Sequence, residues 1–160
     1  MTTSVHDYAR SIVCSPSLAA KLLAPPRDLE FADADPRHDV PSGPVRDEHI
    51  ALAMDGVDKF RDKLPKLSAL TDADARVACL SKFAHHELCA VELFAWALLA
   101  FPSLPVALRR GFVQTLAEEQ THCRLYLQRL EAHGARFGDL RLSDYFWKHT
   151  RAIVESTNPV

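Results

Sequence analysis

The chain has 160 residues, enough for one domain with a sizeable core, and its 48% hydrophobic and 25% charged residues are ordinary for a globular protein. A formal net charge of -2 gives no general attraction to nucleic acid or to an anionic membrane, so neither is expected as a partner. The four cysteines form no C-x-x-C pair and three lie in apolar helical patterns, which indicates reduced thiols and a cytoplasmic location.

The first 44 residues are predicted to form a unit of their own. One or two short helical segments end at Pro25-Pro26. Residues 27–44 are rich in Pro, Asp and Arg, with little to bury, and are expected to form an extended linker along the surface. Residues 45–160 then form the second unit, a helical domain.

Helical periodicity is strong from about residue 45 onward, and no strand pattern stands out. The longest strongly apolar stretch contains Glu92 and is too short to span a bilayer. Two long helices joined by a few residues must pack antiparallel, which predicts an all-α bundle built on one long-helix hairpin with flanking helices. The expected helices cover residues 45–64, a segment from the cap Thr71 to about Phe101, a segment from Pro105 to Gly134, and a last helix capped by Ser143 that fades before Asn158.

Ionisable residues interrupt the apolar stripes of both hairpin helices. Glu87 lies in the stripe of the first of them, and Glu119 and His122 lie in that of the second. Because Glu119 and His122 are three residues apart, both project from one face. The apolar neighbours at helical spacing, which predict burial of these groups, are Leu80, Ala84, Val91, Phe94 and Leu98 on one helix and Phe112, Thr115 and Tyr126 on the other.

The register of the hairpin predicts which of the acids can meet. With the turn centred on Ser103, Glu87 lies 16 residues before it and Glu119 lies 16 residues after it. At about 1.5 Å per residue the two are level on antiparallel helices, whereas Glu92 is displaced by roughly 7 Å along the axis. Glu87 is therefore the better partner for Glu119.

Two carboxylates and an imidazole in an apolar bundle need a partner, because an isolated buried carboxylate costs several kcal/mol. A divalent metal supplies one, and this ligand mixture suits iron or manganese. In ferritin-like bundles two helices each give one Glu and two others each give Glu-x-x-His, so Glu87 with Glu119 and His122 make half of such a set. The alternative is that E-x-x-H lies on a solvated face, as it does in many helices.

Other polar residues of the first hairpin helix have several interpretations. Glu92 is interpreted as a group hydrogen-bonded to a metal ligand, as a further ligand, or as an interhelix salt-bridge partner. His86 and Cys89 have an i, i+3 ligand spacing, although structural roles are favoured for them and for His85. Cys123 points to a different face from His122, which argues against a Cys-His nucleophilic pair.

Four segments of the chain resemble the ferritin-like family known as domain of unknown function 455. They are SLAAKLLAPP (17–26), HHELCAVELFAWALLAFP (85–102), EEQTHCRLYLQRLEAHG (118–134) and FGDLRLSDYFW (137–147). The resemblance implies a four-helix bundle with a di-iron centre, with Glu87, Glu119 and His122 as ligands and Glu92 as a further candidate. It implies no substrate or reaction.

The family pattern includes a second helix pair with another Glu and another E-x-x-H, and this sequence contains a single E-x-x-H. Either the sequence is a shortened form, or two chains meet. A two-fold homodimer would bring together two copies each of Glu87, Glu119 and His122, which completes a four-Glu, two-His set.

The sequence thus predicts a di-iron, or iron/manganese, carboxylate protein of the ferritin-like class, an oxidase or oxygenase of unknown substrate. The alternative is a non-catalytic helical interaction or dimerisation domain with a vestigial half site. Iron storage is the weakest interpretation, since nothing in the sequence indicates a hollow assembly. A role as a hydroxylase of modified tRNA is analogy from the fold alone, and the chain has no basic stripe to support it.

Overall fold

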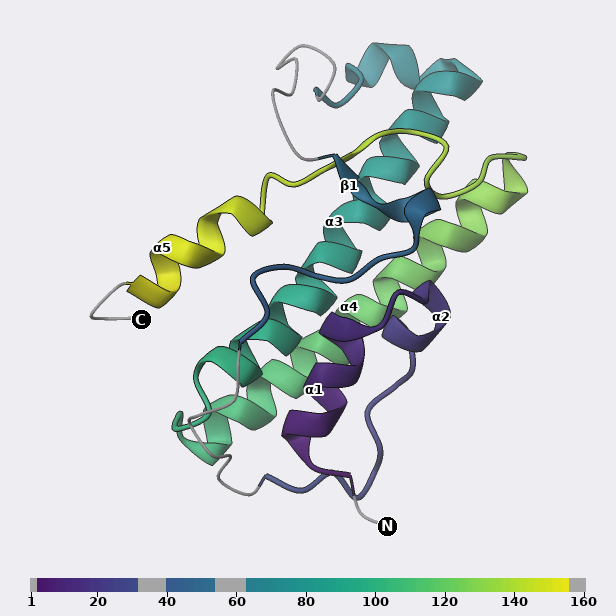
Figure 1. The fold of residues 1–160 in the computed structure, drawn as a ribbon. Helices are drawn as coiled ribbons and strands as arrows, with labels where there is room; N and C mark the ends of the chain where they lie inside the picture. Colours follow the sequence, from purple (N-terminus) through teal and green to yellow (C-terminus); the bar gives the residue numbers. More distant parts are fainter. Residues whose placement is uncertain (1–2, 32–39, 54–62, 156–160) are drawn as a thin grey trace.

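A computed structural model describes residues 3–31, 40–53 and 63–155 of the chain. Two long helices form an antiparallel hairpin along the length of the molecule, and shorter elements pack against it (Figure 1). The described elements, in chain order, are α1 (Val5–Cys14), α2 (Leu18–Lys21), η1 (Glu48–Ile50), β1 (Leu52–Ala53), η2 (Leu67–Thr71), α3 (Ala73–Ala100), α4 (Val106–Ala132), β2 (Leu142–Ser143), η3 (Trp147–His149) and α5 (Thr150–Glu155).

The hairpin helices begin and end close to where the sequence places them. The Asp72 side chain caps α3 by accepting from Ala75 N at 3.0 Å, one residue beyond the predicted cap Thr71. Pro105 caps α4, and Gly134 follows its end with a φ of 72°, the left-handed conformation that glycine adopts readily. The prediction of an all-α protein with one long antiparallel hairpin is confirmed.

The N-terminal helix α1 packs its apolar face on α3. Ser4 caps it by accepting from Asp7 N at 3.0 Å. Its buried residues recur at the spacing of an amphipathic helix and join those of α3 in one hydrophobic cluster. A second hydrophobic cluster joins the halves of α3 and α4 that lie away from the turn between them to the segment after α4. The α1 contribution to the first cluster is Val5, Tyr8, Ala9, Ile12 and Val13.

The predicted helix over residues 45–64 is wrong for the part that the structure describes. Val45 N donates to Val13 O at 2.8 Å and Asp47 N donates to Pro16 O at 3.0 Å, so this stretch runs extended beside the N-terminal segment. A single 3-10 turn and the short strand β1 follow, and β1 pairs in parallel with β2. Because these backbone groups are hydrogen-bonded to other segments, they do not form the hydrogen bonds of a helix. Residues 54–62 lie outside the described residues.

The predicted last helix also begins later than expected. Ser143, the expected cap, belongs to β2 and accepts from Tyr145 N at 3.1 Å. The chain becomes helical only at η3 and α5, because Leu142 and Ser143 are held by pairing with β1.

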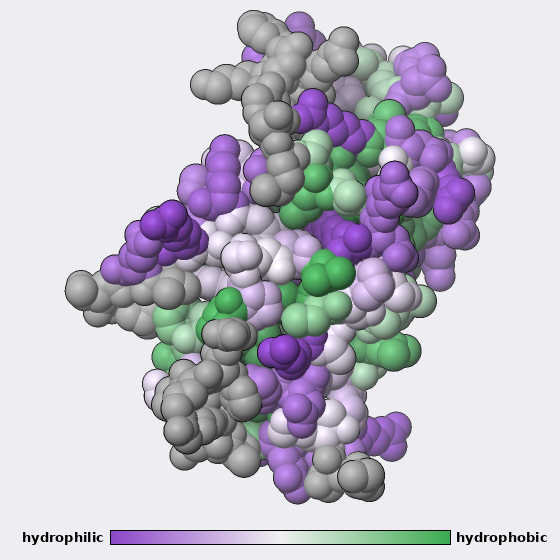
Figure 2. All heavy atoms as spheres, in the orientation of Figure 1, coloured by the Kyte–Doolittle hydropathy of each residue, from purple (hydrophilic) through white to green (hydrophobic). Residues whose placement is uncertain are grey.

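Helix α3 is long and apolar enough to cross a membrane by length and composition, with a mean hydropathy of 1.2 in its best window. In that window 56% of the helix is buried inside the fold, as in the core helix of a soluble protein, so this is weak evidence of a span. On the face seen in Figure 2, apolar side chains lie in separate patches among polar ones.

Candidate metal centre

Glu87 and Glu119 lie near the middle of the two hairpin helices. Glu87 is about halfway along α3, and Glu119 is about halfway along α4. Since the helices are antiparallel and joined by a short turn, these midpoints are level, as the hairpin register predicts.

Glu87, Glu119 and His122 come together between the two helices. One ligand atom from each of the three lies within 4.8 Å of the others. The His122 Nδ1–H donates to Glu119 Oε2 at 3.0 Å. Two atoms bonded to one ion at about 2.0–2.6 Å are themselves no more than about 4–5 Å apart, so the cluster is close to the dimensions of a first coordination sphere.

The expectation that these groups are buried is wrong for His122 and holds only in part for the two carboxylates. The Glu119 side chain is 22% exposed and that of His122 is 53% exposed, while Glu87 is half-buried. The hairpin face that carries them is only partly covered by described residues, so solvent reaches the cluster. Solvent access provides a route for an ion to enter, and it leaves room for ligands from outside the chain.

The pKa values of the two carboxylates in the cluster shift in opposite directions. Burial, followed by the hydrogen bond with Glu119 and its negative charge, raises the pKa of Glu87 from 4.5 to about 7. The hydrogen bond with Glu87 lowers the pKa of Glu119, and the hydrogen bond to Glu119 raises the pKa of His122. A cation bound between the two carboxylates would take the place of a proton on Glu87 and would remove the repulsion between them.

The donor set fits iron or manganese chemically. Two carboxylates and one imidazole are ligands that suit these metals, and the carboxylates are close enough to bridge. Glu119 and His122 would exchange their mutual hydrogen bond for bonds to the ion. Three protein ligands per chain would leave open coordination positions.

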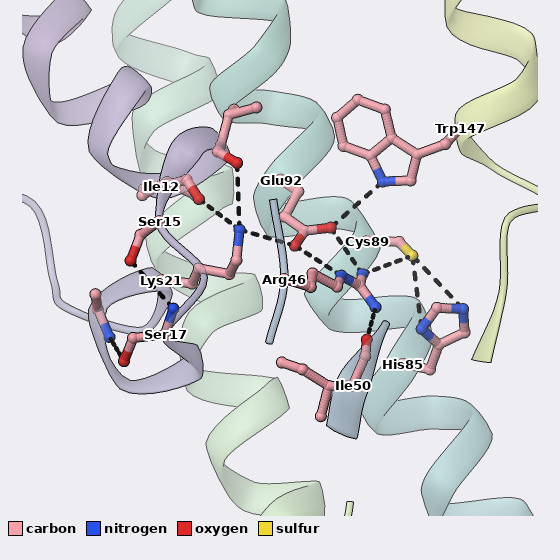
Figure 3. A network of polar contacts seen from close by, with 12 residues as sticks. Ile12, Ser15, Ser17, Lys21, Arg46, Ile50, His85, Cys89, Glu92 and Trp147 are labelled. Atoms are coloured by element: carbon pink, nitrogen blue, oxygen red, sulfur yellow. Dashed lines mark hydrogen bonds and ion pairs between the residues drawn. The ribbon is translucent and has the colours of Figure 1, made fainter. Parts of the chain in front are cut away.

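Glu92 lies elsewhere, in a buried network of polar contacts (Figure 3). Lys21 Nζ is 3.1 Å from Glu92 Oε1, and Arg46 Nη2 is 2.7 Å from Glu92 Oε2. Arg46 Nε also donates to Oε1 at 3.0 Å, and Trp147 Nε1 donates to Oε2 at 3.3 Å. Of its three interpretations, the structure supports the salt bridge, and the network joins α3 to α2, to the segment before η1 and to η3.

Two cations therefore surround one carboxylate in an interior without solvent. The exposed fractions of the Lys21 and Glu92 side chains are zero, and that of Arg46 is 2%. Burial lowers the pKa of Lys21, an effect that Glu92 partly opposes. Lys21 Nζ also donates to Ile12 O at 2.6 Å, so its protons have partners on the backbone. This arrangement stabilises the fold only while the carboxylate is present.

Cys89 and the neighbouring histidines contact other side chains and backbone groups of the fold. Arg46 Nη2 lies 3.5 Å from Cys89 Sγ, and the His85 ring lies 3.7 Å from it. Burial raises the pKa of Cys89 to about 12, so the thiol stays protonated and is a poor metal ligand. His85 Nε2–H donates to Ser143 O at 2.8 Å, and His86 packs edge-on against Phe146.

Sequence reasoning missed Lys21, Arg46 and Trp147 as partners of Glu92. A lysine within the apolar stretch around Leu18 and Leu22 is a local signal for a buried cation. Arg46 has no such signal, since it lies in a polar segment and its partner is far along the chain.

The DUF455 profile, described as a protein of unknown function, matches residues 12–158, which is nearly the whole chain. The chain belongs to the DUF455 family. No curated protein and no solved structure matches it. Glu87, Glu119, His122 and the network around Glu92 all lie within the part of this DUF455 chain that the profile covers.

Proposed function

We propose that this DUF455 protein binds divalent iron or manganese through Glu87, Glu119 and His122, as a carboxylate-bridged centre of the ferritin-like class. The convergence of the three donor groups within 4.8 Å at the middle of the hairpin carries the proposal. A bound pair of such ions would supply redox chemistry with dioxygen, so an oxidase or oxygenase is the reaction class that we favour.

The chain's own residues have distinct parts in this proposal. Glu87 and Glu119 would hold the ions and offset their charge, and Glu87 would give up its proton on binding. His122 would add a ring nitrogen from the more exposed side of the cluster. The partly exposed position of the cluster would give a substrate access to it.

A second copy of the chain would supply the remaining ligands. Because Glu87 and Glu119 lie near the middle of α3 and α4, a two-fold axis beside them would bring the two clusters together. Such a homodimer carries four Glu and two His at its centre, the set found in ferritin-like bundles.

The proposed compartment is the cytoplasm. The cysteines of the described residues are free, with Cys89 and Cys123 buried in the helical core and Cys14 and Cys79 half-buried. Free thiols used as small apolar side chains suit a reducing environment.

The second candidate is a non-catalytic interaction domain in which the metal site is vestigial. It is favoured by one observation: the three groups already satisfy one another, through the Glu87–Glu119 hydrogen bond and the His122–Glu119 contact at 3.0 Å. The cluster thus needs no metal in order to be stable at the surface.

Metal content and molecular mass, measured together on protein purified without chelator, test the proposal. The comparison is the double variant Glu119→Ala/His122→Ala. About two iron or manganese ions per dimer, lost in the variant, is the result that we expect. Metal-free protein whose mass and stability do not change in the variant would support the interaction domain.

A further inference from the structure

A large apolar cavity lies on the same face of the hairpin as the metal cluster. Its volume is about 510 Å³, and its walls come from α3, from α4 and from the segment around η3 and α5. On α3 the lining includes Ala90, Phe94 and Ala97, which follow Glu87 at helical spacing toward the turn. The cavity and the metal cluster therefore form one continuous strip, with Glu87 in both.

The size of the cavity is that of a ligand site. Small-molecule sites occupy about 300–1,000 Å³, and this cavity, which is half open to solvent, falls within that range. From Glu87 to Phe101, the residue that follows the end of α3, the lining extends over 14 residue steps (101 − 87), or about 21 Å at the helical rise. The cavity is therefore elongated, and it suits an alkyl chain better than a compact ring system.

The chemistry of the walls selects an uncharged ligand. Apart from His86 and Glu87 at one end, the lining consists of apolar side chains and the small side chain of Cys89. No lysine or arginine occurs among the described residues that line the cavity. A carboxylate or phosphate drawn into it would be desolvated without a counter-charge, and the cost of this would oppose binding.

We propose that this cavity binds an uncharged, elongated aliphatic molecule, with one end of the chain beside Glu87. The inference rests on the proposed function in one respect: if Glu87 holds a metal, the bound aliphatic molecule belongs to the substrate class of the metal centre. Binding itself needs only the cavity. The position beside Glu87 would bring the end of the chain next to the open coordination positions.

Tryptophan fluorescence tests the proposal directly. Trp96 lines the cavity, and Trp147 lies 6.4 Å from it between ring centroids, so a bound bromoalkyl chain would quench both. The probe is ω-bromo-undecanol, and its matched anion is ω-bromo-undecanoate. We expect saturable quenching by the alcohol, with about tenfold weaker binding of the acid, which corresponds to about 1.4 kcal/mol. No saturable quenching, or tighter binding of the acid, would overturn the proposal.

Two pairs of variants locate the site. Ala97→Phe fills the cavity and is expected to abolish quenching, while Ala132→Phe, at the exposed end of α4, leaves quenching unchanged. Leu108→Lys puts a cation at the partly exposed mouth and is expected to reverse the preference in favour of the acid. Its control is Leu125→Lys, on α4 outside the cavity. If all four variants bind like wild type, the probe binds elsewhere and the proposal fails.

Mass and metal content distinguish this proposal from that for the metal centre. Glu119→Ala/His122→Ala is expected to lose metal and keep the alcohol, whereas Ala97→Phe keeps metal and loses the alcohol. If Ala97→Phe instead converts a dimer to a monomer, a second copy of the chain fills the cavity, and the ligand proposal is overturned.

Discussion

The ammonium nitrogen of Lys21 lies 3.1 Å from Oε1 of Glu92, and neither side chain is exposed to solvent. Arg46 binds the same carboxylate, so among the described residues Glu92 is the carboxylate that balances both buried cations. The three side chains hold α2, the segment before η1 and α3 together, and Trp147 adds the segment after β2.

The two cations and the carboxylate should respond unequally to substitution. Glu92→Gln leaves Lys21 and Arg46 buried without a counter-charge and should lower the free energy of unfolding by about 3–5 kcal/mol. Lys21→Met leaves the Arg46–Glu92 pair intact and should cost less, about 1–2 kcal/mol for the lost hydrogen bonds. Urea unfolding followed by circular dichroism measures both. A cost for Lys21→Met equal to that for Glu92→Gln would contradict this order.

The sequence predicted the convergence of Glu87 and Glu119 better than it predicted the buried network, for a physical reason. Glu87 and Glu119 are related by two regular helices and a short turn, so a constant rise per residue places them level with each other. Lys21 and Arg46 reach Glu92 through irregular segments whose course no local period determines. Glu92 was therefore identified as a polar residue in an apolar helix, while its partners were not.

The failed helix over residues 45–64 has a related cause. Its apolar spacing suggested a helix, but Arg46 is drawn into the interior by Glu92. The backbone N–H groups on either side of Arg46 donate hydrogen bonds to the carbonyl oxygens of Val13 and Pro16 in the N-terminal segment. In this stretch tertiary context overrode a local pattern.

Glu119 should matter for metal and little for folding. Its side chain is partly exposed, so Glu119→Gln should change the free energy of unfolding by no more than about 0.5 kcal/mol while abolishing metal binding. The control is Glu118→Gln, at a neighbouring exposed position where Gln114 is the hydrogen-bond donor. Metal content per chain and urea unfolding of both variants check this. Retention of metal by Glu119→Gln would refute the ligand assignment.

Metal affinity should rise with pH from about 6 to 8. The pKa of metal-free Glu87 is about 7, so below that pH an incoming ion must displace a proton, which weakens apparent binding. The raised pKa of His122 acts in the same direction, because a protonated imidazole cannot bind a metal. Calorimetric titration with Mn²⁺ at three pH values, in buffers of different ionisation enthalpy, measures the affinity and the protons released. A pH-independent affinity with no proton release would exclude Glu87 as a ligand.

The two glycines Gly111 and Gly138 should respond oppositely to replacement by alanine. Gly138 has a φ of 99°, and a Cβ there would lie 2.4 Å from His49 O, so Gly138→Ala forces η1 and the segment after α4 apart. We expect a loss of about 1–3 kcal/mol. Gly111→Ala, in the exposed middle of a helical turn of α4, should gain about 0.5–1 kcal/mol by reducing the entropy of the unfolded chain. Thermal and urea unfolding of the two variants, side by side, make the comparison. A stabilising Gly138→Ala would mean that the close approach of His49 to the segment after α4 is absent in solution.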